Sequence, residues 1–340
     1  MAVLTFHEND RSIPGEPCGP SVGDVAELPR LTTTVPREYV HRSSLAEVFL
    51  TGCTKLDDTH FALSGQWPRA HTFFTSADGV RHDPMQAAET IRQTGLYLAH
   101  AELGVPLGHQ FLMWDLHVTA YAERLAIGAE PSDLDLTAVC TSMKWKGKRL
   151  SEFSMEISVE RDGVACAVGG GRFTCIAPAT YQRLRAGAGA RAGSGPGRGH
   201  GAGRTHPPAA PEASVFGRTL PFDVVLSPSD RPGRWLLDPD PRHPILFDHS
   251  GDHMPGMVLL EAARQAACGL LHPEPLTPSD IQAEFFRYAE FGAPCWIEAG
   301  ELPEDGDGSR RVLVTGRQEG ETVFTARIAG PVDPSRASAP

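Results

Sequence analysis

The chain has 340 residues, 41% of them apolar, and a formal net charge of −11 with a pI near 5.7. This length fits two ordinary domains, and the apolar content suffices for hydrophobic cores. The acidity argues against a general nucleic-acid-binding surface and favours solubility.

Membrane and disulfide classes are also disfavoured. We expect no membrane span, because the chain has no uninterrupted apolar run of about 18 residues. The start, MAVLTFHENDRS, lacks the basic-then-apolar design of a secretion signal. The seven cysteines are scattered without a CxxC pair, which suits reduced thiols better than a disulfide framework or a zinc site. We therefore expect a cytoplasmic protein with no metal site and no membrane or nucleic-acid partner.

The first half of the chain predicts one helix among several strands. Residues 1–37 are rich in Pro, Gly and charge without periodicity, which predicts a flexible leader before a domain at 38–185. Strands are expected at 43–50 and 60–67, a helix at 83–100, and strands at 110–120, 135–147, 149–163 and 164–176. Arg161-Asp162-Gly163 predicts a hairpin turn before the last of these strands. One helix followed by an antiparallel meander indicates the α+β class.

The second half repeats this order after a spacer. Residues 186–213 contain no large apolar side chain, which predicts a flexible Gly/Ala/Pro-rich linker before a domain at 214–330. The domain is expected to contain strands at 221–226 and 233–238, a helix at 257–271, and strands at 281–291, 294–302, 310–320 and 322–330. Residues 331–340 are expected to be a frayed tail.

The helix at 257–271 is apolar except for Glu261, Arg264 and Gln265. A helix that is apolar on almost every side belongs inside a core, where polar groups are costly unless they are paired. Their spacing of three and four places all three on one helical face. His249, His253 and Gly256 precede or open this helix, where free backbone N–H groups favour negative charge. This combination predicts a reaction site.

The helix at 83–100 carries Glu89, Arg92 and Gln93 at the same spacing. The two glutamates are as far apart in the chain as His71 is from His243, and each of these histidines follows a Pro-Arg pair. From this single offset we infer an internal duplication of a whole domain. A short sheet curled around each helix explains why the helix needs no polar face, and two such sheets can join at their edges.

This arrangement is typical of the hotdog fold, and two resemblances follow. The helix start Met254-Pro255-Gly256 with Glu261 resembles that of hydroxyacyl-carrier-protein dehydratases, in which the matching Glu and an upstream His, here His249, are catalytic. The His-Phe-Pro context of those enzymes is absent here.

The chain more closely resembles the A-factor biosynthesis (AfsA-type) hotdog family, over residues 38–178 and 214–330. The matching segments are Val40-His41-Arg42, 46–48, 67–71, 83–84, 88–93, 105–111, 247–249 and 261–265. The resemblance implies a double hotdog that transfers a β-ketoacyl group from a carrier-protein or CoA thioester to the hydroxyl of dihydroxyacetone phosphate. It implies a role in γ-butyrolactone, butenolide or furan signals that control antibiotic production. It also maps the family's Glu and Arg onto Glu89, Arg92, Glu261 and Arg264, and it requires no cofactor. A homodimer is compatible with it.

The chemistry needs a base, oxyanion donors and a grip on the acceptor. Glu261 or Glu89 is the candidate base, because burial raises a carboxyl pKa, although a neighbouring Arg lowers it. Helix-start N–H groups near Gly256 suit the oxyanion, and Arg264 or Arg92 suits a phosphate. His249 is a further catalytic candidate, and the second half, with the fuller set of groups, is favoured as the active one. The remaining substrate-binding candidates are Gln265, Gln93, His253, His71 and His243.

Several alternatives stay open. Each Glu–Arg pair is alternatively an internal ion pair that satisfies itself. His71 and His243 are alternatively strand-end residues with structural hydrogen bonds, and His253 a helix cap. A site that combines His71 of one half with Glu261 of the other is also conceivable. The competing functions are dehydration or hydrolysis of acyl thioesters, and acyl binding without catalysis.

Overall fold

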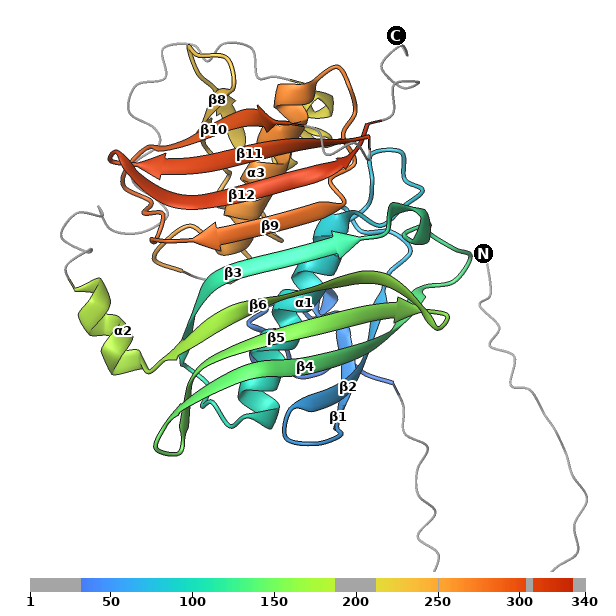
Figure 1. The fold of residues 1–340 in the computed structure, drawn as a ribbon, viewed down its shortest axis with the longest axis vertical. Coiled ribbons are helices and arrows are strands. Elements are labelled where there is room, and N and C mark those ends of the chain that lie inside the picture. Colours follow the sequence, from blue (N-terminus) through green and yellow to red (C-terminus); the bar gives the residue numbers. More distant parts are fainter. Residues whose placement is uncertain (1–31, 187–211, 250, 304–307, 333–340) are drawn as a thin grey trace, which may run out of the picture. The chain divides into compact units, whose positions relative to one another are not determined.

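The computed structural model describes residues 32–186, 212–249, 251–303 and 308–332. Most of the expected leader, linker and tail therefore lie outside the described residues. Within the described part, twelve strands form one antiparallel sheet, and two long helices, α1 (Pro84–Tyr97) and α3 (Gly256–Leu271), cover one of its faces (Figure 1).

The first half contributes six strands in the order β1-β2-β4-β5-β6-β3. Their bounds are β1 Leu50–Lys55, β2 His60–Trp67, β3 Gln110–Ala120, β4 Ser132–Lys146, β5 Arg149–Arg161 and β6 Val164–Ile176. Helix α1 begins where the Asp83 side chain accepts a hydrogen bond from the Met85 N–H at 2.9 Å, with Pro84 in the first turn. A short helix that was not predicted, α2 (Pro178–Arg185), follows β6.

The second half repeats the pattern as β9-β12-β11-β10-β8-β7. Its strands are β7 Leu226–Pro228, β8 Arg234–Leu237, β9 Asp280–Phe285, β10 Cys295–Leu302, β11 Ser309–Gln318 and β12 Glu321–Pro331. β3 pairs with β9 at the centre, with Val118 opposite Ile281. The strand order is therefore the same when read outward in both directions. This confirms the predicted joining of two sheets at their edges, and among the described strands it leaves only β1 and β7 at an edge.

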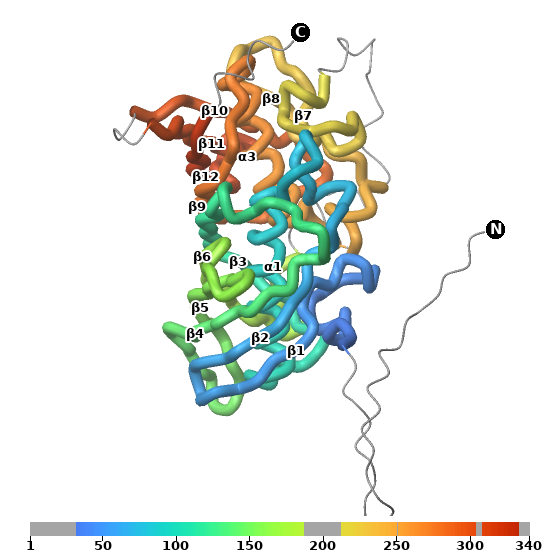
Figure 2. Tube along the Cα trace, turned by 90° about the vertical axis from the view of Figure 1, so that its right-hand side faces the viewer, coloured from blue at the N-terminus to red at the C-terminus, as the bar shows by residue number. Residues whose placement is uncertain are grey.

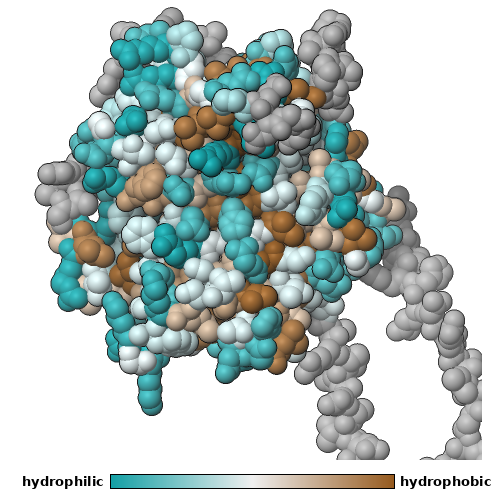
Figure 3. Space-filling model, in the orientation of Figure 1, coloured by the Kyte–Doolittle hydropathy of each residue, from teal (hydrophilic) through white to brown (hydrophobic). Residues whose placement is uncertain are grey.

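The helices and the sheet form two layers. Figure 2 shows α1 and α3 on the same side of the sheet. Residues of β4 alternate between buried and exposed from Ser132 to Ala138, as expected for a strand with one face on a core. Figure 3 shows the outer face of the sheet, where polar residues predominate and hydrophobic ones are scattered. Residues 257–268 of α3 are all buried, which explains its nearly uniform apolar sequence.

Two expected strands are wrong in most of their length. Residues 43–50 form a 3₁₀ turn at Leu45–Glu47 before β1 begins, and residues 221–226 form a 3₁₀ turn at Pro221–Asp223 before β7 begins. The physical reason is a side chain of the central helix. The Gln93 amide binds the Phe49 N–H and the Glu47 C=O, at 3.0 and 2.7 Å. In the second half Gln265 makes the matching pair of bonds, to the Val225 N–H and the Asp223 C=O. These bonds replace ladder hydrogen bonds, so that the segments cross the helix instead of extending the sheet.

Two boundaries also differ from expectation. The leader was expected to run to residue 37, but Val35 is buried and its N–H donates to the Leu50 carbonyl at 2.9 Å. The strand expected at 281–291 ends at Phe285. The segment that follows it turns away because the Gln318 side chain bonds the backbone of Glu290 in both directions.

Candidate active site

The first Glu–Arg cluster consists of Arg42, Glu89, Arg92 and Gln93. The Glu89 side chain is fully buried, and the Arg42 and Arg92 guanidinium groups each lie 2.7 Å from its Oε1. Arg92 Nε also donates to Glu89 Oε2 at 2.8 Å, and the Gln93 amide donates to Oε1 at 2.8 Å. The carboxylate thus has two guanidinium partners instead of the one that the helical spacing predicted.

The second Glu–Arg cluster consists of Arg218, Glu261, Arg264 and Gln265. Glu261 is also fully buried and accepts from Arg218 Nη2 at 2.5 Å, Arg264 Nη2 at 2.8 Å and Gln265 Nε2 at 2.6 Å. The two clusters therefore repeat one another, as the duplication predicts.

Sequence reasoning missed Arg42 and Arg218 as members of these clusters. Each follows a residue in the left-handed conformation that ends a 3₁₀ turn, His41 (φ 52°) in one half and Gly217 (φ 65°) in the other. Arg42 belongs to a quoted family segment, but it is farther from Arg218 in the chain than Glu89 is from Glu261. A search at one fixed offset therefore could not connect the two arginines.

The charges of the arginines decide the ionisation of both glutamates. Burial by itself would raise the pKa of Glu89, but Arg42 and Arg92 outweigh it and lower that pKa to about 2. Arg218 and Arg264 likewise outweigh burial and lower the pKa of Glu261 to about 2. At neutral pH both carboxylates are ionised and weakly basic, which does not favour the role of general base.

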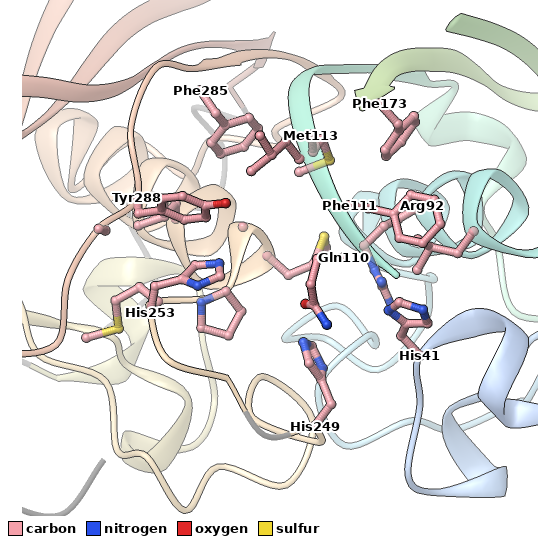
Figure 4. A pocket seen from close by; sticks show the side chains of 18 of the residues that line it. His41, Arg92, Gln110, Phe111, Met113, Phe173, His249, His253, Phe285 and Tyr288 are labelled. Atoms are coloured by element: carbon pink, nitrogen blue, oxygen red, sulfur yellow. The ribbon is translucent and has the colours of Figure 1, made fainter. Parts of the chain in front are cut away.

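A cavity of about 280 Å³ lies between elements of the two halves (Figure 4). Its walls combine residues of α1, β3, the segment before α3, the α3 start and the segment after β9. The apolar lining includes Leu96, Phe111, Leu112, Met113, Phe173, Met257, Leu259 and Phe285, and the polar lining includes His41, Arg42, Arg92, Gln110, His249, His253, Arg287 and Tyr288. Figure 4 shows the Gln110 amide between His249 and His41. The cavity thus has a cationic region and an apolar wall.

The cavity separates the predicted site residues into two groups. Arg92, His249, His253 and Gly256 line it, and Glu89 and Gln93 are bonded to one another beside Arg92. The predicted residues that do not line it are Glu89 and Gln93, which lie behind Arg92, and Glu261, Arg264, Gln265, His71 and His243. The second half therefore contributes its helix start and the preceding segment to the cavity, but not its Glu–Arg cluster.

His71 and His243 were predicted either to bind substrate or to make structural hydrogen bonds, and their geometry is the structural one. His71 Nδ1 accepts the backbone N–H groups of residues 73 and 74, and His243 Nδ1 accepts those of residues 245 and 246. The opposite ring nitrogens face carboxylates, Glu47 at 3.4 Å and Asp223 at 3.1 Å. Both nitrogens of the His243 ring are thus hydrogen-bonded within the protein, and His71 has one hydrogen-bonded nitrogen and one that faces a carboxylate.

Two other histidines present neutral rings to the cavity. Burial, followed by the charges of Arg92 and Arg42, lowers the pKa of His249 to about 4, and its buried Nδ1 has no hydrogen-bond partner among the described residues. Burial, followed by Arg92, lowers the pKa of His41 to about 3, and His41 Nε2 lies 2.9 Å from His100 Nε2. The sequence placed His41 in a segment that resembles the family, but it was not predicted as a site residue.

The start of α3 completes the cavity wall. No side chain of the described residues caps this helix, whose first N–H groups have no intrahelical partner. A Cβ at Gly256 would lie 2.9 Å from Met113 Cε, so a side chain there would displace the end of this methionine. The Tyr288 hydroxyl is a further polar group of the wall, buried and without a partner in the part of the chain that the structure describes. Free N–H groups, an unpaired hydroxyl and an unpaired imidazole nitrogen are positions where a polar ligand can bind.

The described residues contain neither a helix suited to spanning a membrane nor a grouped set of metal ligands. None of their helices has the length and apolar character of a membrane-spanning segment. In these same ranges, no three His, Cys, Asp or Glu side chains are grouped as ligands for a metal ion.

Two sheets that each wrap a buried helix, with a polar and apolar cavity between the two units, define a double-hotdog protein with a site suited to an acyl ligand. A crystal structure described as an oleoyl thioesterase from Lactobacillus plantarum has the same fold, with a TM-score of 0.50 and 11% identity over 82% of this chain and 98% of that one. The family model of the A-factor biosynthesis hotdog domain matches residues 23–177 and 205–332. This chain belongs to that family.

Relatives in Streptomyces are named 2-oxo-3-(phosphooxy)propyl 3-oxoalkanoate synthase. The protein from Streptomyces virginiae is 49% identical over 298 residues, which are 88% of this chain and 98% of the relative. The protein from Streptomyces griseus is 38% identical over 295 residues, which are 86% of this chain and 94% of the relative.

Proposed function

We propose that the cavity between the two halves is the site at which this chain transfers a 3-oxoacyl group from a thioester to the free hydroxyl of dihydroxyacetone phosphate. The chain is an acyltransferase of A-factor-type signal biosynthesis, and its product is a 2-oxo-3-(phosphooxy)propyl 3-oxoalkanoate, the ester in the name of its relatives. The structural observation that carries the location is one cavity with guanidinium groups and an apolar wall.

The phosphate of the acceptor binds at Arg92 and Arg42. Arg92 uses Nε and Nη2 for Glu89 and the Val40 carbonyl, while its Nη1 has no hydrogen-bond partner among the described residues. A guanidinium matches a phosphate geometrically, and Glu89 holds both arginines in place from behind. In this proposal Glu89 is a positioning residue and not a base.

The acyl chain lies against the apolar wall. Leu96, Phe111 and Phe173 provide that wall on the side of the first half, and Met257 and Phe285 provide it on the side of the second. The Tyr288 hydroxyl, which has no partner within the described ranges, donates to an oxygen of the acyl group. A 3-oxo group can accept this bond, whereas a saturated chain offers no acceptor there.

The α3 start stabilises the oxyanion. As the acceptor oxygen attacks the thioester carbon, negative charge develops on the carbonyl oxygen, and the N–H groups near Gly256 are fixed donors for it. His249 is neutral and supplies a further hydrogen bond from the same wall. Collapse of this intermediate releases the thiol and leaves the ester.

The thioester donor is a carrier-protein or CoA conjugate, and we place the reaction in the cytoplasm. The six described cysteines are free, as expected in a reducing compartment.

The decisive experiment incubates the purified protein with a 3-oxoacyl thioester and dihydroxyacetone phosphate. Release of free thiol and formation of the phosphorylated ester are expected only when the acceptor is present. Arg92→Ala should slow the transfer, while Arg327→Ala, on an exposed part of β12 away from the cavity, should not. Thiol release without acceptor would contradict the proposal in favour of hydrolysis, and loss of water from a 3-hydroxyacyl thioester would favour dehydration. Tight acyl binding without turnover would favour a binding protein.

A further inference from the structure

A hydrogen-bonded network lies beside the cavity and joins three segments that are distant in the chain. The Tyr181 hydroxyl of α2 donates to Asp252 Oδ1 at 2.6 Å, and His253 Nδ1 lies 2.7 Å from the same oxygen. Arg185 of α2 donates to Asp252 Oδ2 at 2.9 Å and also pairs with Glu290 at 2.6 Å. None of the other roles assigned to the cavity uses this network.

The network fixes the tautomer of His253. An ionised carboxylate only accepts hydrogen bonds, so the short contact to Asp252 requires the proton on His253 Nδ1. Asp252 is ionised: burial would raise its pKa, but hydrogen bonds from Tyr181, His253 and Arg185 outweigh burial and lower it. The other ring nitrogen, Nε2, is therefore left with its lone pair free. Figure 4 shows the His253 ring beside Tyr288 in the cavity wall, and the two ring centroids are 4.5 Å apart.

We propose that His253, oriented by Asp252, is the general base that takes the proton of the acceptor hydroxyl, and that Tyr181 and Arg185 of α2 position this pair. The inference rests on the proposed acyl transfer and adds to it the group that moves the proton. It also assigns a function to α2, which lies outside the sheet and is not one of the two central helices.

The other candidates at the cavity are less suited to this role. Glu89 is engaged by two guanidinium groups. His249 and His41 lie near the positive charges of Arg92, which oppose a second positive charge on either ring. Only His253, among the described cavity histidines, has a carboxylate in hydrogen-bond contact with its ring, and this contact stabilises the imidazolium when it forms.

The step balances without any further reagent. His253 Nε2 takes the hydroxyl proton while the acceptor oxygen forms a bond to the thioester carbon, and the carbonyl electron pair moves onto the oxygen held at the α3 start. When that pair returns, the carbon–sulfur bond breaks and the sulfur takes the proton back from the imidazolium. The products are the ester and the free thiol.

Several groups around His253 set its response to pH. Burial lowers its pKa, the hydrogen bond and charge of Asp252 act in the opposite direction, Arg185 lowers it further and Glu290 raises it. Tyr181 and Tyr288 face the same ring from α2 and from the segment after β9. Removal of the Asp252 charge should therefore move the acid limb of the rate profile to lower pH.

The experiment measures kcat, KM and the pH–rate profile of the full chain with a 3-oxoacyl thioester and dihydroxyacetone phosphate. For His253→Gln we expect kcat to fall about 10²- to 10⁴-fold with little change in either KM. Asp252→Asn should lower kcat less and shift the acid limb to lower pH, and Tyr181→Phe should have the smallest effect. His117→Gln is the matched control, because this half-exposed histidine of β3 pairs with Glu156 and does not line the cavity.

Two results would overturn the inference. One is a His253→Gln variant that transfers at the wild-type rate, and the other is an NMR spectrum of ¹⁵N-labelled histidine in which neutral His253 carries its proton on Nε2. The spectrum decides the question even when a variant does not fold. If the wild-type protein itself shows no acceptor-dependent transfer, the proposed function fails. If the wild type transfers and His253→Gln does so equally, only the role of the pair fails.

Discussion

The two Glu–Arg clusters are alike in composition and contacts, yet only the first one reaches the cavity. In each, the arginine from outside the helix donates to a carbonyl of the opposite half, Arg42 to that of Ile245 and Arg218 to that of Phe73. An aspartate of that opposite half lies close to each, Asp248 at 3.9 Å and Asp83 at 3.5 Å. The clusters thus tie the halves to each other in both directions.

The difference lies in what surrounds them. The Phe73 ring covers the Arg218 guanidinium, with 3.8 Å from Cζ to the ring centroid, and Arg264 keeps only 3% of its side chain exposed. At the matching position the first half meets Ile245, and Arg92 keeps 12% of its side chain exposed, toward the cavity. A duplicated buried ion cluster is therefore not by itself a reaction site. It becomes one where a neighbouring cavity gives a ligand access to its arginine.

The largest expected effect contrasts the two glutamates. Glu261→Gln removes the carboxylate that bonds both Arg218 and Arg264 and leaves these buried arginines only the more distant Asp83, which should lower the free energy of unfolding by about 3–5 kcal/mol. Glu89→Gln should cost less, because Arg92 borders the cavity and can be hydrated there. Urea denaturation of both variants measures the contrast. A Glu261→Gln protein of normal stability that has lost transfer would make the second cluster catalytic.

The next effect contrasts the two helix arginines in catalysis. Arg92→Ala should reduce kcat/KM for dihydroxyacetone phosphate about 30- to 100-fold, since a hydrogen bond to a charged group contributes roughly 2–3 kcal/mol. With dihydroxyacetone, which has no phosphate, the variant and wild type should differ much less. Arg264→Ala should lower stability but leave the activity per folded molecule unchanged. Equal losses with both acceptors would remove the phosphate role of Arg92.

The cavity histidines make the stability of the first half depend on pH. The second Glu–Arg cluster lacks this dependence, since Gly217 stands there in the place of His41. The folded-state pKa values of His41 and His249, about 3 and 4, lie below the ordinary 6.5. Between pH 6.5 and about 4 the unfolded chain thus binds protons that the folded protein does not. Stability should therefore fall as the pH drops through this window, by up to about 1.4 kcal/mol per pH unit for each proton.

Chemical denaturation at pH 5.0 to 6.5, above the range where the glutamates titrate, measures this slope. His41→Gly makes the first half resemble the second at this position, and both it and His249→Gln should reduce the slope. An unchanged slope in both variants would mean that neither ring is held neutral.

The smallest effect concerns Tyr288. Its hydroxyl has no hydrogen-bond partner among the described residues, whereas the Glu261 carboxylate of the second Glu–Arg cluster is fully engaged within the protein. Tyr288→Phe should lower the preference for a 3-oxoacyl over a saturated acyl thioester about 5-fold, the equivalent of one hydrogen bond of about 1 kcal/mol. The free energy of unfolding of the Tyr288→Phe variant should equal that of the wild type. Competition between the two thioesters in one reaction gives this preference directly, and no change would exclude Tyr288 from recognition of the 3-oxo group.

Local sequence patterns determined much of this protein. The apolar helices with three polar residues each, the single offset that relates the two halves and most strands follow from side-chain periodicity and repetition, because periodicity records which face of an element is buried. The family segments gave the reaction class. The wrong strands at 43–50 and 221–226 show the limit, because the backbone bonds of Gln93 and Gln265 cross 44 and 40 positions of the chain.

Only the tertiary structure decided which half presents its arginine to a ligand. That choice depends on how Phe73 and Ile245 fill space against the opposite unit, and side-chain volumes from distant segments have no period in the sequence. The same holds for the low pKa values of the two glutamates, since Arg42 and Arg218 reach them from outside the helices. It also holds for the Asp252–His253 pair, whose orienting Tyr181 stands 71 positions away from Asp252. Charge and packing act through space, so these properties exist only once the chain has folded.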